Sequence, residues 1–150
     1  MPDETDLPPP PDVVGTRLDG DRAYVIAPQQ NAALCRSTGI EPAPDGIAHP
    51  IYYYIATQIA MGMTVAGLCA TCDFDVADGP MMAGSSARFH GPLRTGVPYR
   101  VTGEIAGLVR KRSRKLGVMD LLDYRLRLHD GETVVVEAQN NWVLPRKELA

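Results

Sequence analysis

The chain has 150 residues, of which 45% are hydrophobic and 22% are charged, and its formal net charge is −3. This length and composition are typical of one globular domain with a core of its own. The slightly negative balance argues against a protein that binds nucleic acid through its overall charge. No run of about 18 or more uninterrupted apolar residues occurs, so the sequence predicts no membrane span.

The amino-terminal residues differ in composition from the rest of the chain. They are acidic and include four consecutive prolines, the opposite of a signal peptide's basic and then apolar start. We therefore predict a disordered tail over residues 1–15 and a single domain over residues 16–150. The chain has 3 cysteines, and an odd number suits a reducing compartment better than a disulfide framework. The sequence thus predicts a cytoplasmic protein.

Three short elements are expected before the main apolar segment. Residues 23–26, AYVI, have strand character. Residues 28–38 predict a helix, because Pro28 suits a first helical turn and Gly39 can terminate it. Residues 40–47 contain two prolines and a glycine and predict a loop.

A long apolar segment follows, from Pro50 to about Cys69. It is apolar nearly all round, which is typical of a helix buried on most sides. Its length favours a helix over a strand, although Gly62 and Gly67 weaken helix formation toward its end. We predict one central helix that includes residues 50–66, followed by an irregular segment over residues 73–84.

The second half of the chain changes to a period of two residues. Apolar and polar residues alternate over three long stretches, and Asp130-Gly131 is a strong hairpin signal between the last two. The simplest packing that buries both parts is an antiparallel sheet, built largely from residues 85–144, wrapped around the helix. The predicted fold class is therefore α+β. Because a small sheet leaves its edges uncovered, we also expect a dimer.

Three stretches resemble the MaoC-like hydratase and dehydratase family. They are residues 46–50 (GIAHP), residues 86–96 (SARFHGPLRTG) and residues 130–138 (DGETVVVEA), in an order and spacing that cover about residues 16–146. The resemblance implies the hot-dog fold, in which the sheet wraps one central helix. It also implies hydration of enoyl thioesters or dehydration of 3-hydroxyacyl thioesters, with coenzyme A as part of the substrate and without another cofactor or a metal.

In this family, an Asp and a His before the central helix hold the water, and a backbone N–H at the helix start polarises the thioester carbonyl. The candidates here are Asp45 and His49 as catalytic residues and Pro50, Ile51 and Tyr52 as substrate-binding residues. The match is imperfect, because the Asn-Pro string that joins the family's Asp and His is absent. Pro50 has no N–H, so the donor role would shift to Ile51.

These departures make the chain more similar to the amino-terminal or non-catalytic halves of heteromeric family members. We therefore predict an acyl-CoA-binding subunit that forms a homodimer or a heterodimer with a homologous hot-dog subunit. Two alternatives stay open. One is a self-sufficient, atypical enoyl-CoA hydratase, and the other is a hot-dog acyl-CoA thioesterase, although residues 50–69 lack the acidic helix residue that such enzymes often use.

Two further groups of residues have both a functional and a structural interpretation. Residues 110–115, RKRSRK, lie at an expected hairpin, where Arg110, Arg112 and Arg114 could hold the phosphates of coenzyme A or simply face solvent. Cys69 and Cys72 have redox-motif spacing, but burial in the core is the favoured interpretation. Asn140 falls on the apolar face of the last strand and needs a partner if it is buried.

Overall fold

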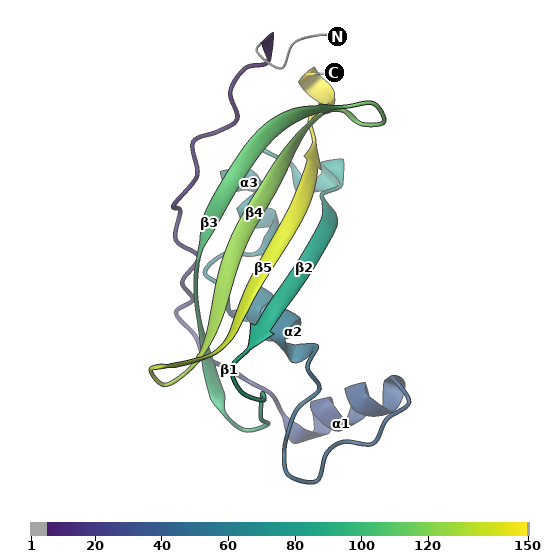
Figure 1. Cartoon of the computed structure of the whole chain (residues 1–150), viewed down its shortest axis with the longest axis vertical. Coiled ribbons are helices and arrows are strands. Elements are labelled where there is room, and N and C mark those ends of the chain that lie inside the picture. The colour runs from purple at the N-terminus through teal and green to yellow at the C-terminus, as the bar shows by residue number, and fades with distance from the viewer. Residues whose placement is uncertain (1–5, 150) are drawn as a thin grey trace.

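The computed structural model describes residues 6–149, which form a curled antiparallel sheet with helices on one of its faces (Figure 1). The strand order in the five-stranded sheet is β1-β3-β4-β5-β2. The strands are β1 (Tyr24–Val25), β2 (Met81–Phe89), β3 (Pro98–Ser113), β4 (Gly117–Asp130) and β5 (Thr133–Pro145). The helices are α1 (Pro28–Ser37), α2 (Tyr52–Ala60) and α3 (Val65–Thr71), with short 3-10 helices at η2 (Val76–Asp78) and η3 (Lys147–Leu149).

The antiparallel strands of the second half are confirmed, because β3, β4 and β5 follow one another through hairpins. Their apolar residues face the helices in register, as in the row that pairs Val101 with Leu128 and Leu128 with Val136. The turn between β4 and β5 has Gly131 at a φ of 58°, a conformation that glycine adopts without strain. The sheet begins earlier than predicted, since β2 starts at Met81 inside the segment expected to be irregular.

The prediction of one helix over residues 50–66 is wrong, because the apolar segment forms two helices. α2 ends at Ala60, and the axes of α2 and α3 differ by 63°. The break occurs where residues 18–20 cross the end of α2: the Gly62 N–H donates to the Leu18 carbonyl at 2.9 Å. A Cβ atom on Gly62 would lie 2.4 Å from the carbonyl oxygen of Asp19. The close approach therefore requires glycine and stops the helix.

Residues 6–20 run along the outside of β3 (Figure 1). Backbone hydrogen bonds join Gly15 to Ile105 and Leu18 to Gly103, both at 2.9 Å. Val13 is buried in the core. The segment thus covers the β3 edge, and within the predicted tail residues 8–9 and 13–15 contact the domain. The predicted domain boundary at residue 15 stays a prediction, and residues 1–5 of the tail lie outside the described residues.

The other edge of the sheet is open. Among residues 6–149, β2 pairs only with β5. On the face of the sheet that carries the helices, β2 exposes Met82 (43%) and Phe89 (41%), whose partners across the strands are Trp142 and Val136. A long strand with an unpaired edge and exposed apolar side chains is unusual at a free protein surface.

Cys69 and Cys72 are buried free thiols, so the prediction that they pack in the core is confirmed. Burial raises the pKa of the Cys72 thiol to about 11, and this thiol is therefore protonated at neutral pH. Among the described residues, no single helix has the length and apolar character needed to cross a membrane, and only the bent pair α2 and α3 meets both criteria together.

Candidate functional site

The predicted catalytic loop packs against the segment that precedes β3. The Ala48 N–H donates to the Leu93 carbonyl at 2.7 Å, and the Thr95 N–H donates to the Gly46 carbonyl at 2.9 Å. The loop therefore lies at the end of the sheet where β3 begins. The start of α2 follows directly from it, as the sequence predicted.

The two predicted catalytic side chains make separate local contacts. Asp45 is exposed, and its carboxylate accepts the N–H of Ile47 at 3.2 Å, as is usual for an aspartate in a turn. His49 is half-buried. Its ring Nδ1 accepts the backbone N–H of Ile51 at 3.1 Å, and the backbone N–H of His49 donates to the Asn31 side-chain oxygen at 2.8 Å. Each side chain stabilises the loop, and no hydrogen bond joins the two.

The helix start offers no free N–H group to a thioester carbonyl. The Ile51 N–H, the expected donor, already bonds to His49, and the N–H groups of Tyr52 and Tyr53 donate to the carbonyls of His49 and Pro50, each at 3.1 Å. Tyr52 is buried in the core, and this burial raises the pKa of its hydroxyl. A substrate role for Pro50, Ile51 and Tyr52 stays a prediction, but in this conformation the Ile51 donor is occupied.

The basic residues of the β3–β4 hairpin divide into two groups. Arg110 is 8% exposed; its Nε and Nη2 atoms donate to Asp120, and its Nη1 atom donates to the carbonyls of Pro8 and Pro9. Arg110 therefore does not present its guanidinium to a coenzyme A phosphate in this structure. Arg112 and Arg114 are exposed, and a phosphate-binding role for them stays a prediction.

The hairpin and the catalytic loop lie at opposite ends of the sheet (Figure 1). β3 begins at Pro98, next to the loop, and ends at Ser113, so the strand that joins the two regions is about 50 Å long at about 3.3 Å per residue. Arg112 and Arg114 therefore lie far from His49 of the same chain.

A polar cluster lies between α2 and the sheet. It consists of Tyr53 and Gln58 from α2, Ser85 from β2, Tyr124 from β4, and Asn140 and Trp142 from β5. Hydrogen bonds link Tyr53 to Ser85 at 2.8 Å, Ser85 to Asn140 at 2.6 Å, Tyr124 to Gln58 at 3.2 Å and Trp142 to Tyr124 at 3.1 Å. The sequence indicated Asn140 alone, because it is a polar residue at an inward position of β5.

Two donors of this cluster are buried without a partner: the side-chain nitrogen atoms Nε2 of Gln58 and Nδ2 of Asn140. Asn140 is fully buried. Burial also raises the pKa of Tyr124, so its hydroxyl stays protonated at neutral pH. The cluster therefore offers hydrogen-bond donors and no base that could activate water near neutral pH.

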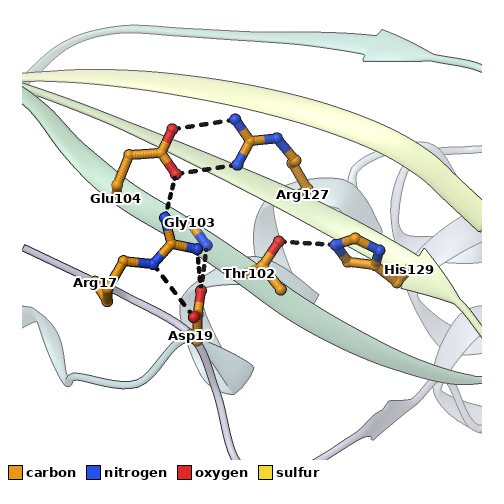
Figure 2. A network of polar contacts seen from close by, with 7 residues as sticks. All are labelled: Arg17, Asp19, Thr102, Gly103, Glu104, Arg127 and His129. Carbon is orange, nitrogen blue, oxygen red and sulfur yellow. Dashed lines mark hydrogen bonds and ion pairs between the residues drawn. The ribbon is translucent and has the colours of Figure 1, made fainter. Parts of the chain in front are cut away.

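The opposite, outer face of the sheet carries a charged network (Figure 2). Arg17 pairs with Asp19 at 2.8 Å and with Glu104 at 3.4 Å, and Arg127 binds Glu104 at 3.0 Å. The hydrogen bond from Arg127 holds the pKa of Glu104 below its usual value. The paired charges fasten the segment that covers β3 to the sheet. Among residues 6–149, no three His, Cys, Asp or Glu side chains are grouped to hold a metal ion.

Known proteins similar to this chain are found by structure and not by sequence. No family model and no curated protein match the sequence. The 3R-hydroxyacyl-ACP dehydratase complex HadBC of Mycobacterium tuberculosis is similar with a TM-score of 0.66 and 15% identity, over 89% of this chain and 98% of that chain. The ChsH1–ChsH2 complex of the same organism has a TM-score of 0.56 and 16% identity, over 86% and 82%.

The fluoroacetyl-CoA-specific thioesterase FlK is similar with a TM-score of 0.58 and 15% identity, over 90% of each chain. Proteins with different activities therefore share this architecture, and at such identities the likeness establishes the fold alone. The resemblance that the sequence motifs indicated is confirmed at that level: this chain has the hot-dog fold.

Proposed function

We propose that the chain is an acyl-thioester-binding subunit of an enoyl-CoA hydratase or 3-hydroxyacyl dehydratase, without a working Asp–His pair of its own. The observation that carries this proposal is the helix start. The Ile51 N–H donates to His49 Nδ1, while Asp45 is exposed in its own turn. A hydratase site needs a base near the substrate and a free N–H donor for the developing enolate charge. In this loop the Ile51 N–H is already bonded, and the Asp45 carboxylate faces solvent with no hydrogen bond to His49.

The open edge of β2 supports a second hot-dog subunit as the partner. β2 has an unpaired edge among the described residues and exposes Met82 and Phe89 beside it. Two of the similar structures carry names of two-component complexes, HadBC and ChsH1–ChsH2. A homologous partner that carries the Asp and His would complete both the sheet edge and the chemistry.

The proposal is tested with crotonyl-CoA. The purified chain is expected to bind crotonyl-CoA without hydrating it, and hydration is expected when a homologous hot-dog subunit, such as a neighbouring-gene product, is added. As a control, Asp45→Asn should leave the hydration rate of the two-subunit mixture unchanged within about twofold, because general acid–base groups contribute far larger factors.

Three results would contradict the proposal. Hydration by the chain alone that falls about 10²–10⁴-fold in Asp45→Asn or His49→Ala would identify a self-sufficient hydratase. Release of free coenzyme A from crotonyl-CoA would identify a thioesterase, an activity printed in the name of the structural neighbour FlK. Failure of the chain to bind any acyl-CoA, alone or with the partner, would exclude the acyl-thioester role itself.

A further inference from the structure

We propose that the buried amides of Asn140 and Gln58 bind the carbonyl oxygen of the acyl thioester, so that the polar cluster under α2, and not the helix start, is where this chain recognises the acyl group. The inference rests on the proposed function, since it assumes that an acyl thioester binds. It assigns the recognition to residues outside the predicted catalytic loop.

The orientation of both amides is set by their neighbours. The Asn140 side-chain oxygen accepts the Ser85 hydroxyl at 2.6 Å, and the Gln58 side-chain oxygen accepts the Tyr124 hydroxyl at 3.2 Å. Tyr124 is held in turn by the indole N–H of Trp142. Because each oxygen already has a donor, each NH₂ group points away from it and lacks an acceptor.

The two free NH₂ groups belong to one site. Tyr124 and Asn140 are directly opposed on neighbouring strands, and Gln58 reaches the Tyr124 hydroxyl from α2. Buried polar groups without partners are rare in folded proteins, because they lose their bonds to water and gain nothing in return. Two such donors beside one tyrosine therefore indicate an acceptor that binds between α2 and the sheet.

The chemistry of the cluster selects a neutral acceptor. Its members are two hydroxyl-bearing tyrosines, a serine, two amides and an indole, and none carries a charge at neutral pH. A carboxylate or phosphate buried here would have no counter-charge and would bind at high cost. A thioester carbonyl is uncharged, accepts two hydrogen bonds and has apolar groups on either side that suit the surrounding layer.

The cluster is reached from the open edge of the sheet. Ser85 is exposed on β2, and Tyr53, which bonds to it, is half-buried beside Phe89 with a ring-centroid distance of 6.0 Å. The Tyr53 hydroxyl can rotate to admit a ligand while Ser85 keeps its bond to Asn140. The same edge is the one proposed to meet the second subunit, so the acyl group would enter where the two subunits join.

The test compares two coenzyme A derivatives that differ by one oxygen atom. Butyryl-CoA has the thioester carbonyl, and the thioether S-butyl-CoA has a methylene group in its place. The chain contains a single tryptophan, Trp142, which belongs to the cluster, so its fluorescence reports binding directly. The wild-type protein is expected to bind butyryl-CoA about tenfold more tightly than S-butyl-CoA, the scale of hydrogen bonds to one carbonyl.

Asn140→Leu is expected to abolish this preference while binding of S-butyl-CoA stays within about twofold of the wild type. The matched control is Asn141→Leu, which makes the same change one residue along, at an exposed position on the outer face, and should keep the preference. Should Asn140→Leu fail to fold, Gln58→Met supplies the same comparison from α2.

The possible failures are distinguishable. Equal binding of the two ligands by the wild type, or an unchanged preference in both Asn140→Leu and Gln58→Met, would overturn this inference and leave the proposed function standing. Absence of binding of either ligand to the wild type, alone and with the second subunit, would overturn the proposed function and this inference with it.

Discussion

At the scale of single residues, Asp120 is the buried carboxylate that joins distant parts of the chain. Its oxygens accept from Arg110 Nε and Arg146 Nε, both at 2.8 Å, and Asp120 itself is fully buried. Arg146 also donates to the carbonyls of Cys72 and Asp73 at the end of α3. One carboxylate thus holds β3, β4, the end of α3 and the segment after β5 in place.

Asp120→Asn is expected to destabilise the fold by about 3–5 kcal/mol, because it removes the buried charge shared by two guanidinium groups. Among residues 6–149 the change leaves Arg110 without an ion-pair partner, while Arg146 keeps only Glu148 at 3.7 Å. Urea unfolding followed by circular dichroism measures the change. Asp123→Asn is the control: its partly exposed carboxylate on the outer face accepts only from Gln139, at 3.0 Å, so the loss should be below about 1 kcal/mol. Equal losses in the two variants would contradict the role of Asp120.

At the scale of elements, the end of α2 is decided by a contact with the amino-terminal segment. Gly62 has no side chain, and the Asp19 carbonyl occupies the space that a Cβ would need. Thr64 then starts α3, since its side chain accepts the N–H of Gly67 at 3.0 Å, the usual geometry of a helix N-cap. The break lets residues 15–20 pair with β3 and cover that edge of the sheet.

Gly62→Ala is therefore expected to destabilise the protein by about 1–3 kcal/mol, the usual cost of overpacking, although alanine favours helix by itself. The control is Gly91→Ala after β2, where, apart from its chain neighbours, no described residue comes within 4 Å of the added Cβ. Its effect should stay within about 1 kcal/mol in thermal unfolding. A stabilised Gly62→Ala would mean that the Asp19 contact does not end the helix.

At the scale of the whole molecule, the two edges of the sheet have opposite surroundings. The β3 edge is covered by the chain's own residues 15–20, and the network of Arg17, Asp19 and Glu104 fastens them there (Figure 2). The β2 edge has only β5 beside it among the described residues. Because only the β2 edge is open, we expect a partner subunit to bind along β2, next to the polar cluster between α2 and the sheet.

Met82→Lys combined with Phe89→Lys is expected to separate the chain from its partner subunit at micromolar concentration, because both side chains are about 40% exposed on β2 and charged groups oppose burial in an interface. Light scattering measures the mass. Val25→Lys changes an equally exposed apolar residue on β1 and should leave the mass unchanged. A wild-type protein that stays monomeric both alone and with the homologous second subunit present would contradict the proposed interface.

The sequence by itself determined the features that depend on local chemistry. The period of two residues predicts β3, β4 and β5, Asp130-Gly131 predicts the turn between the last two, and the apolar run predicts helical structure packed on the sheet. Together with the three motifs, these were sufficient to predict the hot-dog fold. Each of these signals is contained within a stretch of neighbouring residues.

Only the tertiary structure decided how individual side chains are used. Arg110 in a basic hairpin suggests a phosphate site, but a carboxylate 10 positions away and two proline carbonyls about 100 positions away hold its guanidinium. The polar cluster between α2 and the sheet includes hydrogen-bonded pairs of residues that are 32, 55 and 66 positions apart in the sequence. The end of α2 likewise depends on its contact with residues 18–20. Hydrogen-bond partners and close packing depend on chain segments that are distant in the sequence and adjacent in space, and local sequence patterns do not show which segments become adjacent.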